Sequence, residues 1–180
     1  MNIIPSISPA LHDKIQRRNH SNYAEIWTLL DAVCDPEIPV LSIWDIGILQ
    51  DIEYVEGKYK IIITPTYSGC PAVDAIKEDI AKQLEDNNIL NYEIKTRLSP
   101  AWTTDCMTLE GNNKLREYGI APPVDVPNGC ALHVTPTENV LCPHCRSRNT
   151  TIISEFGSTS CKALFKCNDC YEPFDFFKCI

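Results

Sequence analysis

The chain has 180 residues, of which 44% are hydrophobic, so it can hold one ordinary domain and a small module and is neither disordered nor fibrous. Its formal net charge of -8 excludes nucleic acid as the main partner, because phosphate binding depends on lysine and arginine. An acidic surface of this kind suits protein or small-molecule partners.

Cysteine usage indicates the cellular compartment. Ten cysteines would suggest disulfides in a short secreted chain. However, Pro5 and Pro9 interrupt the apolar N-terminal run and its basic residues follow it, so it does not resemble a secretory signal. No apolar stretch is long enough to span a bilayer. We therefore expect a cytoplasmic protein with reduced thiols, in which paired cysteines bind metal or carry out redox chemistry.

The first two thirds of the chain predict an α/β (α+β) domain. Residues 1–20 are polar and interrupted by proline, so we expect a loosely ordered N-terminal arm. A compact domain with a small sheet is predicted over residues 21–120, from hydrophobic periodicity and turn signals. Its expected elements are a helix over 23–34, strands over 48–55 and 59–64, a helix from 71 to 87, a strand over 92–98 and a helix ending at Gly119.

The composition changes after this domain. Residues 121–139 are rich in proline and show no sustained periodicity, so we expect a linker there. The remaining segment, 140–180, contains six cysteines. A piece this short buries little core and normally needs a metal to fold.

Two CxxC pairs predict that metal site. Cys142 and Cys145 form the first pair, and Cys167 and Cys170 form the second, with 21 residues between them. Two such turns on facing hairpins would supply the four thiolates of a tetrahedral structural Zn²⁺ site, which makes the segment a zinc ribbon. Two local redox pairs are the alternative, but neither pair lies at a strand-to-helix junction of thioredoxin type.

The other cysteines of the segment leave two interpretations open. Cys161 and Cys179 either pack in the core or act as extra ligands of a second site with Cys70 or Cys106. The nearby phenylalanines favour a small core or a contact patch for a protein.

A third candidate site follows the strand that ends near Thr64. Cys70 comes after a Tyr-Ser-Gly turn and before Pro71, which places it at the N-cap of the next helix, where the helix dipole lowers a thiol pKa. A small buried cap residue is the alternative. Asp35 and Glu37 flank Pro36 and could bring two carboxylates to Cys70, giving a weak, open iron or iron–sulfur site. In the other interpretation, Asp35 caps backbone amides and Glu37 is solvated.

Several segments resemble a known family. The stretches DPEIPVLSIWDIGIL and TPTYSGCPA are similar to the iron–sulfur-assembly domain of bacterial and eukaryotic maturation factors. The stretches SPAWTTD, KLREYGIAPP, CPHC, ISEFGSTSCKALFKC and EPFDFFKCI narrow the resemblance to the PaaD family of phenylacetate-degradation proteins. In this family the motif cysteine falls on Cys70 and the acidic turn on Asp35 and Glu37. One departure is Cys106, where the family usually has tryptophan.

The resemblance implies a role beside the multicomponent 1,2-phenylacetyl-CoA epoxidase, a monooxygenase with a di-iron subunit and an iron–sulfur flavin reductase. We expect a non-catalytic maturation factor that transiently carries iron or a cluster at Cys70, with the zinc ribbon as a docking module. The alternative is a permanent structural or electron-transfer subunit of the epoxidase. No nucleophile–base pair, phosphate loop or dinucleotide fingerprint points to a separate enzyme. Expected partners are the reductase, other iron–sulfur assembly proteins and a second copy of the chain.

Overall fold

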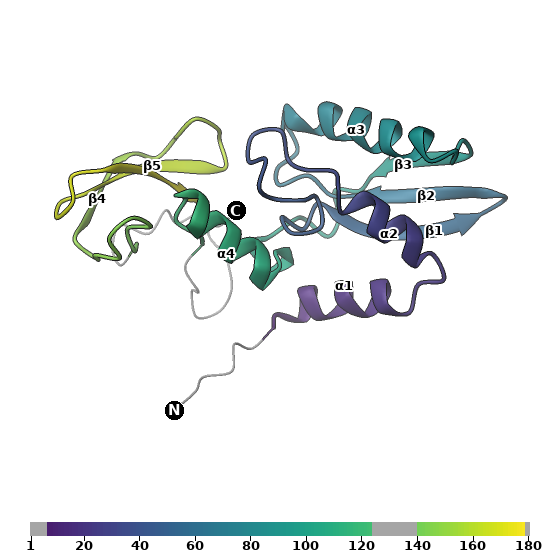
Figure 1. Ribbon diagram of the computed structural model, residues 1–180, viewed down its shortest axis with the longest axis horizontal. Coiled ribbons are helices and arrows are strands. Elements are labelled where there is room, and N and C mark those ends of the chain that lie inside the picture. Colours follow the sequence, from purple (N-terminus) through teal and green to yellow (C-terminus); the bar gives the residue numbers. More distant parts are fainter. Residues whose placement is uncertain (1–6, 124–139, 179–180) are drawn as a thin grey trace. The chain divides into compact units, whose positions relative to one another are not determined.

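The computed structural model describes residues 7–123 and 140–178. These residues form two compact units, the first ending at Thr108 and the second beginning at Leu109. Figure 1 shows a helix-covered sheet in the N-terminal unit and a small three-stranded sheet in the C-terminal unit. The expected α+β class, with a small mixed sheet and a separate ribbon, is confirmed.

The N-terminal unit contains one mixed sheet with strand order β1-β2-β3. Strands β1 and β2 form the predicted antiparallel hairpin, and β3 adds in parallel to β2 after the α3 crossover. The elements are helix α1 (Pro9–Asn19), helix α2 (Ala24–Leu30), strands β1 (Leu49–Val55) and β2 (Lys58–Ile63), helix α3 (Ala72–Asp86), strand β3 (Tyr92–Thr96) and the 3-10 turn η1 (Thr104–Cys106).

Helix α1 corrects the expectation of a loosely ordered arm for residues 9–19. Ser8 caps the helix by accepting the Leu11 amide N–H at 3.1 Å, and Pro9 stands in the first turn, where its missing N–H costs nothing. Lys14 is only 1% exposed, and its Nζ donates to the carbonyl oxygens of Trp44 at 2.8 Å and Cys106 at 3.0 Å. The buried face of the helix therefore contains a lysine, so the hydrophobic periodicity of the sequence does not predict that this face is buried.

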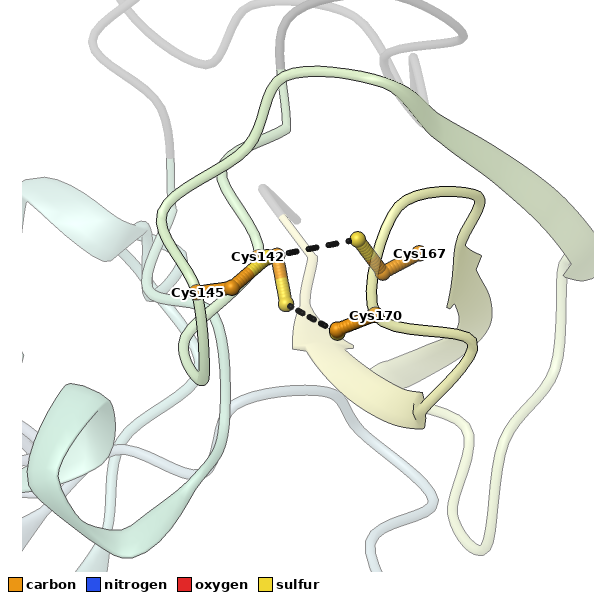
Figure 2. Close-up of side chains that lie close together, drawn as sticks. All are labelled: Cys142, Cys145, Cys167 and Cys170. Atoms are coloured by element: carbon orange, nitrogen blue, oxygen red, sulfur yellow. Dashed lines mark hydrogen bonds between the residues drawn. The ribbon is translucent and has the colours of Figure 1, made fainter.

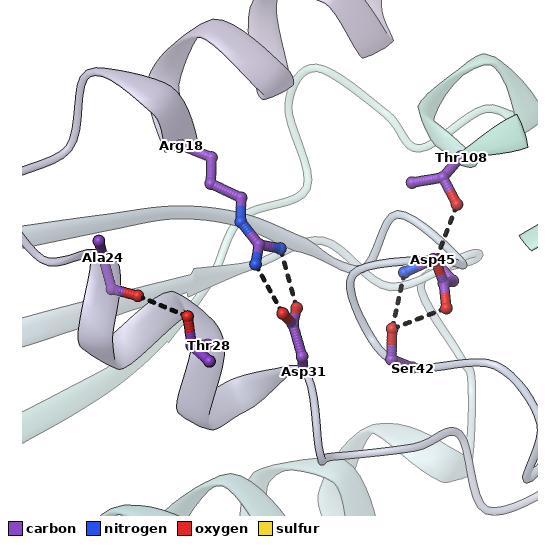
Figure 3. A network of polar contacts seen from close by, with 7 residues as sticks. All are labelled: Arg18, Ala24, Thr28, Asp31, Ser42, Asp45 and Thr108. Carbon is purple, nitrogen blue, oxygen red and sulfur yellow. Dashed lines mark hydrogen bonds and ion pairs between the residues drawn. The ribbon is translucent and has the colours of Figure 1, made fainter. Parts of the chain in front are cut away.

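A buried polar group also joins distant segments of the N-terminal unit. Asp45 accepts the Ser42 hydroxyl at 3.0 Å and the Thr108 hydroxyl at 2.8 Å (Figure 3). Near it, Gly47 has φ +82°, and an added Cβ would lie 2.5 Å from the Cys106 carbonyl oxygen. The turn after Ser42 and the segment around Cys106 are thus held tightly together.

The C-terminal unit contains helix α4 (Leu109–Tyr118) and strands β4 (Thr150–Ser154), β5 (Lys162–Cys167) and β6 (Pro173–Phe177), which form an antiparallel sheet in that order. Phe165, Phe174 and Phe176 lie in its core, as the small-core interpretation predicted. Ala121 also belongs to this core and forms a bridge to Phe176.

The division into units differs from the predicted domain limits. Helix α4 belongs to the C-terminal unit, although we expected the first domain to continue to residue 120. Residues 124–139, most of the expected linker, lie outside the described part of the chain. None of the helices within the described residues has the length and apolar character needed to cross a membrane.

Candidate metal centre and the Cys70 turn

The two CxxC turns of the C-terminal unit share one backbone arrangement. In each, the amide N–H of the first cysteine donates to the carbonyl oxygen five residues later, from Cys142 to Ser147 at 2.9 Å and from Cys167 to Glu172 at 3.0 Å. The second turn connects β5 to β6, and the first lies shortly before β4. The chain thus builds the same turn twice, on segments that the ribbon sheet brings together.

Each turn closes with a residue in the left-handed region. Arg146 has φ +63° and Tyr171 has φ +66°, and each directly follows the second cysteine of its pair. This conformation is costly for a side chain with a Cβ and usually belongs to glycine. Both turns therefore keep a backbone geometry that the local residue type opposes.

The four sulfur atoms converge on one point. All four Sγ atoms lie within 4.8 Å of one another, with Cys142 and Cys170 3.7 Å apart and Cys145 and Cys167 3.5 Å apart (Figure 2). A tetrahedral site with Zn–S bonds of about 2.3 Å has sulfur–sulfur edges of about 3.8 Å. The observed separations fit a single tetrahedral ion with four sulfur ligands.

Backbone amides stabilise a thiolate at this site. The pKa of Cys167 is lowered to about 7, because the amides of Cys170 and Asp169 donate to its sulfur. Burial raises the pKa of Cys142 instead, although the Cys145 amide donates to that sulfur. Since the thiolate is the form that binds metal, Cys167 is the ligand best prepared for it.

A polar network ties the two turns to each other. The Ser147 hydroxyl and the Asn149 amide both donate to the Asp169 carboxylate, the latter at 2.7 Å. Asn168 extends the network by donating to the Asn149 oxygen at 3.0 Å. The bonds from Ser147 and Asn149 lower the pKa of Asp169. Asp169 and Asn149 carry no sequence signal beyond a short polar side chain near a CxxC pair.

Of the other two predicted ligands of this segment, Cys161 does not join the cluster. Cys161 is buried, and its Sγ lies 3.0 Å from the Thr159 hydroxyl. Cys179 lies outside the described residues. Across residues 7–123 and 140–178, the four CxxC cysteines are the one group of three or more histidine, cysteine or acidic side chains placed to hold an ion.

The Cys70 turn differs from its prediction in two respects. The N-cap of α3 is Pro71 rather than Cys70, and the helix begins at Ala72. Burial raises the pKa of the half-buried Cys70 thiol, which opposes the expected lowering, although the Ala72 amide and the Thr66 hydroxyl are both hydrogen-bonded to its sulfur. A protonated thiol is a weak nucleophile, and it must also release its proton before it can bind a metal.

The acidic turn lies close enough to Cys70 for its charges to act on the thiol. The carboxylates of Glu37 and Asp35 both raise the pKa of Cys70. Asp35 is 5% exposed, and its Oδ1 accepts the amides of Glu37 and Ile38 at 2.9 Å each, so it acts as the predicted backbone cap. Glu37 is half-buried and is therefore the carboxylate better placed to approach a ligand beside Cys70.

Two family models match the chain. The model described as iron-sulfur cluster assembly protein matches residues 23–87, which include Cys70 and the acidic turn. The model described as PaaD zinc beta ribbon domain matches residues 128–178, which include all four CxxC cysteines.

Known proteins resemble the chain over different lengths. It is 32% identical to an "Fe-S protein maturation auxiliary factor" of Porphyromonas gingivalis (strain ATCC BAA-308 / W83) over 48% of this chain and 83% of that protein. A crystal structure of "Domain of Unknown Function DUF59 from Bacillus anthracis" covers 58% of this chain and 95% of that one, with a TM-score of 0.48 and 25% identity. A relative from Escherichia coli (strain K12), whose name describes it as a putative subunit of 1,2-phenylacetyl-CoA epoxidase, is 48% identical over 87% of this chain and 92% of that protein. The chain therefore belongs to the PaaD family of putative 1,2-phenylacetyl-CoA epoxidase subunits, which joins an iron–sulfur-assembly domain to a zinc beta ribbon.

Proposed function

We propose that this protein is a cytoplasmic accessory factor that supplies iron or an iron–sulfur cluster to a 1,2-phenylacetyl-CoA epoxidase in aerobic phenylacetate catabolism. The observation that carries the proposal is the 48% identity to the Escherichia coli relative along nearly its whole length. The match of residues 23–87 to iron–sulfur cluster assembly proteins supports a role in supply rather than in the oxidation itself.

The cargo site in this proposal is the Cys70 turn. The Cys70 sulfur would be the primary ligand, oriented by the Ala72 amide and the Thr66 hydroxyl. Glu37 would add a carboxylate, while Asp35 keeps the acidic turn in shape through its two amide contacts. One thiolate and one carboxylate make a weak, open site, which suits cargo that has to leave again.

The ribbon site holds a different metal in this proposal, a permanent Zn²⁺ on Cys142, Cys145, Cys167 and Cys170. Four protein sulfurs fill a tetrahedral shell and leave no open position, so the ion would stabilise the fold and take no part in a reaction. A four-sulfur shell also accepts iron, so metal analysis tests this assignment. Zinc gives one equivalent and a colourless protein, and iron in that amount would contradict the assignment.

Reconstitution tests the cargo role. The apo reductase of the epoxidase receives iron and sulfide in the presence of the wild-type protein, the Cys70→Ser variant or the matched Cys106→Ser variant. Because Cys70 is the primary ligand, Cys70→Ser should reduce cluster transfer at least about tenfold with zinc content unchanged, whereas Cys106→Ser should transfer normally. Full transfer by Cys70→Ser would refute the role given to that thiol.

The name of the Escherichia coli relative favours a second candidate, a permanent structural or electron-transfer subunit of the epoxidase. A turnover assay of epoxidase components whose clusters are already assembled distinguishes the two functions. A maturation factor is dispensable once the clusters are in place, so turnover should proceed without this protein. A stoichiometric requirement for it would favour the permanent subunit.

A further inference from the structure

Strand β3 leaves one side of the N-terminal sheet open. The strand order is β1-β2-β3, and β3 pairs only with β2 among the described strands. The Asn91 carbonyl oxygen accepts the Tyr59 amide at 3.0 Å, and the Arg97 amide donates to the Ile63 carbonyl oxygen at 2.8 Å. Odd-numbered residues of β3 therefore direct their backbone groups toward β2.

The even-numbered residues of β3 point their backbone groups the other way. Tyr92, Ile94 and Thr96 each present an amide N–H and a carbonyl oxygen to the open edge. No partner for these groups exists within residues 7–123 and 140–178. A strand edge of this kind is a template for a further strand.

We propose that this edge pairs with β3 of a second copy of the chain, antiparallel and around a two-fold axis at Ile94. In this register Ile94 faces Ile94 of the second copy, and Tyr92 faces its Thr96, so that all outward backbone groups are hydrogen-bonded across the axis. The interface uses one surface twice, as a closed two-fold dimer requires.

Charge selects this register from its neighbours. With Ile94 on the axis, Glu93 faces Lys95 of the second copy, and the symmetric pair repeats the contact. Two neighbouring registers also let the outward backbone groups of the two copies hydrogen-bond to each other. One of them places Glu93 opposite Glu93 of the second copy, and the other places Lys95 opposite Lys95. Like charges directly opposite one another destabilise a strand pair, so the sequence favours the Ile94 register. Within the described residues of one copy, the Glu93 carboxylate has a single ion pair, with the Lys58 ammonium at 3.7 Å. Lys95 of the second copy would add another cation.

Apolar side chains flank the charged pair. Leu90, which comes shortly before β3, is 76% exposed, and Leu98, which comes shortly after it, is 58% exposed. Continued beyond the strand ends, the Ile94 register places Leu90 of one copy opposite Leu98 of the other. Two such contacts would cover both leucines. Because β3 has five residues, we expect a reversible dimer smaller than a standard interface of about 800 Å² per partner.

Charge reversal and its rescue test the dimer. Sedimentation velocity of the full chain is measured from about 1 to about 100 µM for the wild type, Glu93→Lys, Lys95→Glu and the double variant. Each single reversal places two like-charge pairs across the axis and should weaken dimerisation at least about tenfold, whereas the double exchange restores opposite charges and should regain most of it. Lys82→Glu on α3, the same charge change away from the edge, should dimerise like the wild type.

Thr96→Pro provides an independent variant. The Thr96 amide faces the open edge, so proline removes an intermolecular donor and leaves the bonds between β2 and β3 in place. This variant should remain folded by circular dichroism and lose the dimer. A wild-type chain that stays monomeric at about 100 µM, a dimer indifferent to both reversals, or a double variant that fails to regain association would each overturn the proposal.

Discussion

The two units place different kinds of side chain at their centres. The N-terminal unit encloses large aliphatic and indole side chains, including Trp27, Leu30 and Ile43, that are fully buried. In the C-terminal unit, by contrast, Cys142 and Cys167 belong to the same buried cluster as the phenylalanines. Apolar burial can stabilise the first unit without any ligand, whereas in the second unit core packing and metal binding involve the same residues. The two units should therefore respond differently to metal removal.

Loss of a metal ligand should have the largest effect and should be confined to one unit. Cys145→Ser removes an exposed ligand without changing the apolar core, so the ribbon should lose metal and with it about 10 kcal/mol of folding free energy. Amide exchange in β4, β5 and β6 should become fast. Trp27, Trp44 and Trp102, the three tryptophans of the chain, all lie in the N-terminal unit, and their fluorescence-detected unfolding midpoint should not move.

The matched control for that experiment is Cys161→Ala, which removes a buried thiol outside the four-sulfur group and should keep one equivalent of metal. If the tryptophan midpoint falls together with the metal content in Cys145→Ser, the two units stabilise each other and the comparison fails.

The next effect concerns a charge in the N-terminal core. Burial lowers the pKa of Lys14 to about 7 from an unfolded value near 10.5. Between these values the unfolded chain binds the extra proton, so Lys14 makes the wild type more stable as pH rises. From pH 7 to pH 9 the wild type should gain about 2 kcal/mol relative to Lys14→Met, measured by urea unfolding with tryptophan fluorescence. Arg17→Met, on the same helix, should change stability equally at both pH values.

The smallest effect should come from the strained backbone of the metal turns. Arg146→Gly relieves a left-handed conformation at φ +63° and should stabilise the metal-bound ribbon by about 1 kcal/mol, or about fivefold in competition with a chelator. Tyr171→Gly should gain less, because its ring lies 5.6 Å from the Lys166 ammonium and loses that contact. Arg148→Gly is the control, because φ is not positive at Arg148, and it should not increase metal affinity. An equal increase in metal affinity in Arg148→Gly would contradict the role of strain.

Sequence spacing predicted the four-cysteine cluster better than it predicted the electrostatics of the Cys70 turn. Two CxxC pairs specify ligand type and number, so Cys142, Cys145, Cys167 and Cys170 could be identified from their spacing alone. The electrostatics of Cys70 could not, because a helix terminus suggests a lowered pKa while the amount of burial, which decides the sign here, depends on tertiary packing.

Helix α1 shows a second limit of sequence patterns. Ser8 and Pro9 form a recognisable helix start, but the inward face of the helix carries Lys14, which a periodicity argument counts as polar. Helix α3 was predictable because its buried residues are apolar at helical spacing, and the hairpin because the β-branched run Ile61–Ile63 follows a Glu-Gly turn. The Lys14 ammonium donates to the backbone carbonyls of Trp44 and Cys106, and a pattern of side chains cannot predict a contact with backbone groups.

The docking of α1 also has a consequence for the order of events during synthesis. Its contacts reach far along the chain, since Lys14 donates to the carbonyl of Cys106 and the Ser8 hydroxyl donates to that of Asp105 at 2.6 Å. Helix α1 must therefore wait until some ninety further residues have been synthesised, about 5 to 20 s at ordinary elongation rates, before its docking site exists. Over that interval the Lys14 ammonium can remain hydrated, and its desolvation is postponed to the step that completes the N-terminal unit.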